Sequence, residues 1–152
     1  MTKEDFQGLV ARVTQAVQGR VLDSGLAADL NERFPATGLD FQAIQAACAA
    51  GIAAGWMCAR EQGGIKFGRV IKDVDGYSVD VVEMADVAGP HHRHPNGEID
   101  MIMPIDGTAQ FDGHGAGWVV YGPDSAHQPT VRGGKALVLY LLPGGAIDFS
   151  PA

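Results

Sequence analysis

Hydrophobic residues recur every three or four positions in the first third of the chain. The first such series consists of Phe6, Leu9, Val10, Val13 and Val17. This spacing predicts an amphipathic helix over residues 3–18, and Thr2 and Asp5 are spaced as in a capping box at its start. We expect two further helices, one over residues 25–34 and one that is capped by Asp40 and runs to residue 54.

The pattern changes at Ile65, after which short hydrophobic runs alternate with glycine-rich turns. Strands are predicted at residues 65–71, 77–84, 98–103, 108–111, 117–121, 135–142 and 146–149. About eight short strands with turns at intervals of roughly 8–12 residues are typical of a sandwich or barrel, and a jelly roll is such a fold. We therefore expect a helical segment at residues 1–60, which covers the barrel or forms a dimer contact, and a β-barrel at residues 61–152.

Composition and charge narrow the class of protein. Hydrophobic residues make up 46% of the chain and charged residues 19%, as expected for a soluble globular protein. No apolar run reaches the roughly 18 residues of a membrane helix, and the first residues lack the pattern of a signal peptide. We therefore expect a cytosolic protein without a membrane partner, in which Cys48 and Cys58 stay reduced. A net charge of -7 without a basic stripe argues against a nucleic-acid partner.

The histidines are concentrated in one part of the chain, and three of them share residues 91–98 with a carboxylate. His92 and His94 are two positions apart, so on a strand they point to the same side, and Glu98 returns to that side if the turn keeps the register. His127 is the best candidate for one more donor. Imidazole nitrogens with a carboxylate suit one divalent transition metal, which could be zinc, manganese, iron or nickel. The alternative is that these are surface residues in a proline-bounded turn.

Other side chains are candidates for the same site. His91 precedes the ligand pair and should face away from it, as a hydrogen-bond donor to a ligand, a proton shuttle or a rim residue. Asp100 and Asp112 are possible acceptors for the second N–H of a ligating imidazole. Tyr121 and Tyr140 could line a substrate pocket, although aromatic residues on strands more often belong to the core.

Arg69 is a cation within a predicted strand. It shares one face with Phe67 and Ile71, and because the other face carries lysines, we expect Arg69 to look into the barrel. A buried arginine needs an anionic partner. That partner is either the substrate or, in the alternative, a protein carboxylate such as Glu83 or Asp100.

The histidine spacing resembles the two motifs of the cupin superfamily. The first motif is carried by Gly89, His92-x-His94-x-x-x-Glu98 and Gly107, and the second by Gly122-Pro123-x-Ser125-x-His127. The resemblance implies a mainly β fold, a cupin-type double-stranded β-helix or jelly roll, with an N-terminal helical segment. It also implies a metal held by His92, His94, Glu98 and His127, and a homodimer. Ser125 stands where glycine is usual in this superfamily.

A narrower resemblance is to the bacterial 4-hydroxylaminobenzoate lyases. It is carried by Gly55-Trp56, Gly64-Ile65-Lys66-Phe67-Gly68-Arg69, His92-Arg93-His94-Pro95-Asn96-Gly97-Glu98-Ile99-Asp100, Gly117-Trp118, Ser125-Ala126-His127-Gln128-Pro129-Thr130-Val131 and Leu142-Pro143-Gly144-Gly145-Ala146-Ile147. It implies a metal-dependent lyase that converts 4-hydroxylaminobenzoate and water to 3,4-dihydroxybenzoate and ammonia. In that chemistry Arg69 would pair with the carboxylate of the small aromatic substrate, and Glu98 would move protons.

Two other classes of function stay open. One is a different metal-dependent cupin enzyme, such as a dioxygenase or isomerase that acts on a small acid. Oxygen consumption with iron(II) would distinguish a dioxygenase from the lyase. The other is a non-catalytic metal or small-molecule sensor.

Overall fold

Helices occupy the first part of the chain in the computed structural model, which describes residues 2–149. They are α1 (Lys3–Val17), α2 (Ser24–Arg33) and α3 (Leu39–Ala54). The predicted capping box is confirmed at α1, where Thr2 and Asp5 each accept a hydrogen bond from the other's backbone N–H, at 3.0 and 3.1 Å. At α3 the prediction is wrong in one detail, because Gly38 occupies the cap position and Asp40 lies within the first turn.

Strands follow from Arg60 onward. They are β1 (Arg60–Gln62), β2 (Ile65–Val74), β3 (Tyr77–Ala88), β4 (His92–His94), β5 (Glu98–Pro104), β6 (Gln110–Phe111), β7 (Gly117–Tyr121), β8 (Ser125–His127) and β9 (Thr130–Pro143). The larger sheet has the order β1-β2-β3-β9-β5-β7, with β6 paired to β9, and β4 and β8 form a second, two-stranded sheet. All of these pairs are antiparallel.

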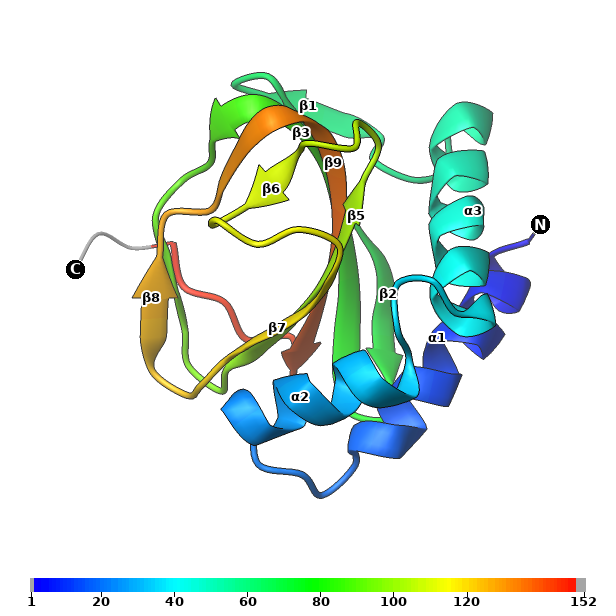
Figure 1. Cartoon of the computed structure of the whole chain (residues 1–152), viewed down its shortest axis with the longest axis vertical. Coiled ribbons are helices and arrows are strands. Elements are labelled where there is room, and N and C mark those ends of the chain that lie inside the picture. The colour runs from blue at the N-terminus through cyan, green and yellow to red at the C-terminus, as the bar shows by residue number, and fades with distance from the viewer. Residues whose placement is uncertain (1, 150–152) are drawn as a thin grey trace.

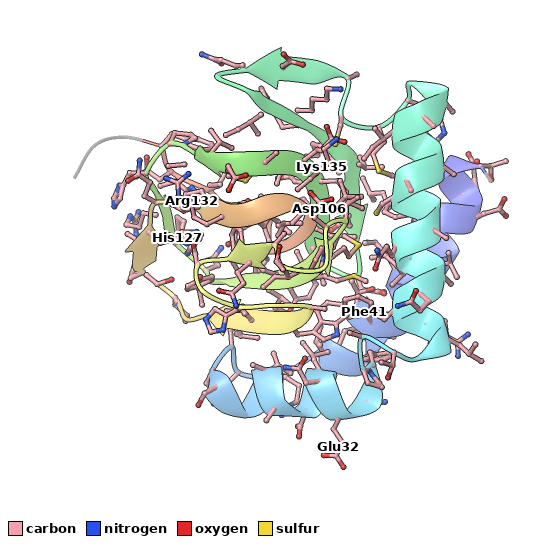
Figure 2. The ribbon with its side chains drawn as sticks, turned by 45° about the horizontal axis from the view of Figure 1, so that its top comes forward. Glu32, Phe41, Asp106, His127, Arg132 and Lys135 are labelled. Atoms are coloured by element: carbon pink, nitrogen blue, oxygen red, sulfur yellow. The ribbon has the colours of Figure 1, made fainter. Side chains whose placement is uncertain are left out.

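The two sheets enclose a barrel, and the helices lie outside it. Figure 1 shows β8, which pairs with β4, on one side of the larger sheet, while α1, α2 and α3 cover the other side and one end. Figure 2 shows Phe41 on α3 and His127 on the opposite side of the molecule. This arrangement is the mainly β, jelly-roll-type barrel with an N-terminal helical segment that the sequence predicts.

Alternation along β9 divides its side chains between two cores. Leu139 and its neighbours at every second position pack with the helices, for example with Phe41 of α3, which is 1% exposed. Val138 and Tyr140 face the other way, into the barrel, where they pack with Phe111. The larger sheet is therefore apolar on both sides at its centre, and the functional side chains lie on the barrel side.

Two strand predictions need correction. Residues 146–149 form no strand, because the glycine pair that precedes them has φ values of +65° and +69° and turns the chain, leaving one isolated bridge between Arg93 and Asp148. In β2, a register shift after Arg69 separates it from Ile71, so these residues do not share a face as predicted. Arg69 still pairs with Asp80 across β2 and β3, whereas Ile71 packs with the helix-facing core.

No helix in residues 2–149 has the length and apolar character needed to cross a membrane.

Candidate metal centre

The short strands β4 and β8 bring the three histidines together. His92 pairs directly with His127, and His94 pairs with Ser125. After His94 the chain turns through Gly97, whose φ of +88° is unfavourable for other residues, and β5 then begins at Glu98. A Cβ atom at Gly97 would also lie 2.8 Å from the carbonyl oxygen of Tyr121, so this turn requires glycine.

Four ligand-type atoms converge at this point, as the spacing predicts. The donor atoms of His92, His94, Glu98 and His127 all lie within 4.8 Å of one another. The Nε2 atoms of His92 and His127 are 3.1 Å apart, and the Nε2 atom of His94 lies 3.2 Å from Oε2 of Glu98. His92, His94 and Glu98 are buried, and the side chain of His127 is 11% exposed.

The other ring nitrogen of each histidine contacts an oxygen. Nδ1 of His92 lies 3.2 Å from the carbonyl oxygen of Pro90, and Nδ1 of His127 lies 2.6 Å from Oδ2 of Asp112. Both oxygens are acceptors, so Nδ1 carries the proton and Nε2 keeps its lone pair.

His94 reaches the same tautomer through a hydroxyl group. Its Nδ1 atom lies 2.9 Å from Oγ of Ser125, and that hydroxyl donates its own proton to the carbonyl of Gly122 at 2.6 Å. The hydroxyl can therefore only accept from His94, and the Nε2 lone pair of His94 also points into the cluster. Ser125 thus fixes the orientation of the His94 ring.

The donor set fits a divalent cation. Three unprotonated imidazole nitrogens and a carboxylate within 4.8 Å repel one another unless a positive charge lies between them. Nε2 of His94 and both carboxylate oxygens of Glu98 are buried without a hydrogen-bond partner among the described residues. Buried polar atoms of this kind are normally satisfied, and a metal ion would satisfy all three. The alternative, that these histidines are surface residues in a proline-bounded turn, does not fit the burial of His92, His94 and Glu98.

Glu98 is held in its ionised form. Burial alone would raise its pKa, but His92 and His94, when their Nε2 atoms donate, and then Asp100 outweigh burial and lower the pKa to about 2. A cation bound between the histidines would take the place of these two protons and favour the carboxylate in the same way. Asp100 shows the opposite behaviour, because burial first and then the charge of Glu98 raise its pKa well above the usual range. The pair therefore consists of a carboxylate on the metal side and a neutral carboxyl group behind it.

Asp112 connects two residues of the site. It accepts hydrogen bonds from the Tyr121 hydroxyl, from Nδ1 of His127 at 2.6 Å and from the backbone N–H of Thr130 at 3.0 Å. Burial would raise the pKa of Asp112, but these three bonds prevail and lower it. Burial, followed by Asp112 itself, raises the pKa of Tyr121, so its hydroxyl stays protonated. Asp112 thus accepts from the imidazole of His127, the contact that was expected of it.

The remaining candidates lie at different distances from the cluster. The ring of Tyr121 contacts those of His127 and His94, with centroid separations of 4.5 and 5.4 Å. Tyr140 is buried in the barrel core and pairs across the sheet with Asp100. His91 is exposed and lies outside the cluster, as expected for a rim residue. Asp100 makes no hydrogen bond with a ligating imidazole among the described residues, so that part of the prediction is wrong.

Arg69 is not buried inside the barrel. Its side chain is 39% exposed, and its Nε and Nη2 atoms donate to the carboxylate of Asp80 at 2.8 and 3.3 Å. It lines surface hollows that also include Lys3. A protein carboxylate thus pairs with Arg69, as in the second of the two hypotheses. The partner is Asp80, and not Glu83 or Asp100. Glu83 pairs with Lys66 instead, at 3.8 Å.

Comparison with known proteins places this geometry in a family. Residues 8–149 match the family described as "PnbB: 4-hydroxylaminobenzoate lyase". The chain belongs to this family. A 4-hydroxylaminobenzoate lyase from Pseudomonas putida is 26% identical to it, over 97% of this chain and 95% of that protein. Another from Nocardioides sp. (strain LMS-CY) is 32% identical, over 65% of this chain and 66% of that protein.

Solved structures resemble the barrel at the level of the backbone. An RmlC-like cupin from Ralstonia eutropha is 17% identical over 57% of this chain and 60% of its own, with a TM-score of 0.44. A cupin-like protein from Thermotoga maritima is 16% identical over 60% of this chain and 79% of its own, with a TM-score of 0.45. The family that the sequence match shows is one of lyases.

Proposed function

We propose that this protein catalyses the conversion of 4-hydroxylaminobenzoate and water to 3,4-dihydroxybenzoate and ammonia, at one divalent metal ion held by His92, His94, Glu98 and His127. Membership of the lyase family supports the reaction, and the names of both relatives give the substrate. The observation that carries the metal is the convergence of the four donor atoms within 4.8 Å. The equation balances, because the product gains one oxygen atom from the water and the nitrogen atom leaves as ammonia, with no oxidant or reductant.

The metal and the chain would divide the chemistry between them. A divalent ion at this position would act as a Lewis acid toward an oxygen atom of the substrate. Glu98 is ionised, so it can accept a proton, and the neutral carboxyl group of Asp100 lies next to it on the same face of β5. Because both groups are buried, bulk water does not compete for these proton positions.

The contacts to the substrate stay predictions. Tyr121 is placed to contact a ligand of the metal ion, since its ring already packs on two histidines. Tyr140 lies deeper, in the barrel core. Arg69 would have to bind the substrate carboxylate through Nη1, because Nε and Nη2 are engaged by Asp80. His91, which is exposed, would contribute at the rim of the site.

Product analysis tests the proposal. The purified protein, loaded with zinc, manganese, iron(II) or nickel in turn, should release ammonia and 3,4-dihydroxybenzoate in equal amounts from 4-hydroxylaminobenzoate, without taking up oxygen. Oxygen uptake with iron(II) would instead indicate a dioxygenase. No turnover with any of the four metals would contradict the proposal.

We also propose that the protein is a cytoplasmic homodimer. Outer strands of an open sheet leave backbone groups unpaired, and a second copy commonly covers such edges. β7 and β1 are the outer strands of the larger sheet. Light scattering at micromolar concentration should give twice the mass of the chain, and the mass of one chain would refute the dimer.

A further inference from the structure

The segment after β9, residues 144–149, crosses from the larger sheet to β4. We call it the C-terminal strap, and Figure 1 shows it in red beside β8. At its beginning, Nη2 of Arg69 donates to the carbonyl of Gly145 at 3.2 Å. At its other end, Arg93 and Asp148 exchange both backbone hydrogen bonds, at 2.7 and 2.9 Å. The strap is therefore fixed to the barrel near both of its ends.

The pairing of Arg93 with Asp148 sets the direction of the next side chain. In an antiparallel bridge the residue after Asp148 lies opposite the residue before Arg93, so Phe149 lies opposite His92. Opposite residues point to the same face. The ring of Phe149 accordingly lies beside that of His92, with centroids 5.5 Å apart and planes inclined by 59°.

Phe149 is exposed in an unusual place. Its side chain is 55% exposed, whereas the ligand His92 beside it is 2% exposed. The other exposed large hydrophobic residues in the described part of the chain are Val21, Leu39 and Ile105, and all lie in or near loops between other elements. Of these four residues, only Phe149 contacts a histidine of the cluster.

A second aromatic ring lies on the other ligands. Tyr121 packs on His94 and His127, and its hydroxyl is fixed by Asp112. Phe149 and Tyr121 thus contact different histidines of the same cluster. Two aromatic surfaces around one metal centre suit a flat, aromatic ligand, because ring pairs add a favourable contact beyond the burial of apolar area.

We propose that Phe149 determines specificity at this site, by forming a wall against which the aromatic ring of the substrate packs. The inference rests on the proposed function in one respect, namely that the substrate is an aromatic acid. In this proposal Phe149, at the exposed end of the strap, contacts the aromatic ring of the substrate and takes no part in proton transfer.

The test compares two probes that differ only in the ring. Benzohydroxamate and acetohydroxamate carry the same metal-binding group, and their dissociation constants can be measured by titration of the cobalt(II)-loaded protein, without any turnover. The wild-type protein should bind benzohydroxamate more tightly. Phe149→Ala should weaken benzohydroxamate binding about tenfold and leave acetohydroxamate binding unchanged. Phe149→Tyr should restore the preference.

The matched control is Leu39→Ala, which removes an exposed apolar side chain, 91% exposed, at the start of α3. It should change neither dissociation constant. Equal binding of the two probes by the wild type, or equal weakening of both by Phe149→Ala, would overturn the inference. So would a loss of bound cobalt or a change of mass in light scattering for Phe149→Ala, because either would assign Phe149 to folding or to an interface. Absence of ammonia release by the wild type would overturn the proposed reaction alone, since the probe ratio is independent of it.

Discussion

The two faces of β5 differ although they belong to the same strand. Ile99 and Met101 face the helices, and both are fully buried among apolar neighbours. Glu98 and Asp100 alternate with them, face the barrel, and are equally buried. The oxygens of both carboxyl groups have no hydrogen-bond partner by geometry among the described residues. Burying such groups lowers the free energy of unfolding, so the barrel face is less stable because of the groups that serve the site. The apolar helix face compensates for this loss.

The largest effect is expected from removing two ligands on the barrel face. The double variant His92→Ala, His94→Ala should lose its metal completely and with it all lyase activity, because two of four donors are gone. Metal content by mass spectrometry and circular dichroism of the same sample test this. Full metal occupancy in a folded double variant would exclude the site.

A change on the helix face should affect stability and leave the chemistry intact. Leu139 is 1% exposed and packs with the helices, so Leu139→Ala should lower the free energy of unfolding by about 2–5 kcal/mol. Metal content and activity below the unfolding midpoint should match the wild type. Urea titration followed by metal analysis separates the two quantities, and a fall in metal affinity would show that the two faces are not independent.

Asp112 offers a smaller change on the barrel face. Asp112→Asn removes the charge that orients His127 and should weaken metal affinity about 10- to 100-fold, with a stable fold. Asp106→Asn is the matched control, since Asp106 accepts from a backbone N–H of β9 and contacts no ligand. Competition with a chelator measures both affinities. Equal affinities for the two variants would mean that the contact with Asp112 does not tune the site.

The sequence predicted the long elements and the convergence of the four donor residues, because each leaves a local signal. α1 follows from the recurrence of apolar residues, and β7 from a short apolar run after Gly117. The ligands follow from fixed spacing. Strands β4 and β8 have three residues each, which is too few to show the alternation of apolar and polar residues that marks a strand. Only the resemblance to the cupin motifs indicated that His92 and His127 meet.

Some of the errors arise because pairing between distant segments overrides the local pattern. The register shift after Arg69 moves Ile71 to the helix-facing core, so the face that the alternation assigned to both residues is not shared. The carboxylate that neutralises it, Asp80, lies on a different strand. The role of Ser125 likewise depends on contact with His94 across the small sheet, and no local signal in the sequence marks it.

Arg69 gives the smallest expected effect and distinguishes its two possible roles. Arg69→Met leaves Asp80 without its partner and releases Gly145, and because the pair is partly exposed we expect a loss of about 1 kcal/mol in stability. Arg69→Lys should recover part of it. If Arg69 also binds the substrate carboxylate, KM should rise in the Met variant as well. Unchanged stability and unchanged kinetics would exclude both roles.

The central claim is that the four converging donors form a metal centre on which lyase activity depends. The most direct test is to strip the protein with a chelator, add back a divalent metal in steps, and follow ammonia release from 4-hydroxylaminobenzoate. The account predicts that the stripped protein is inactive and that activity rises linearly and stops at one metal ion per chain. Full activity in the stripped protein, or activity that does not depend on added metal, would contradict it.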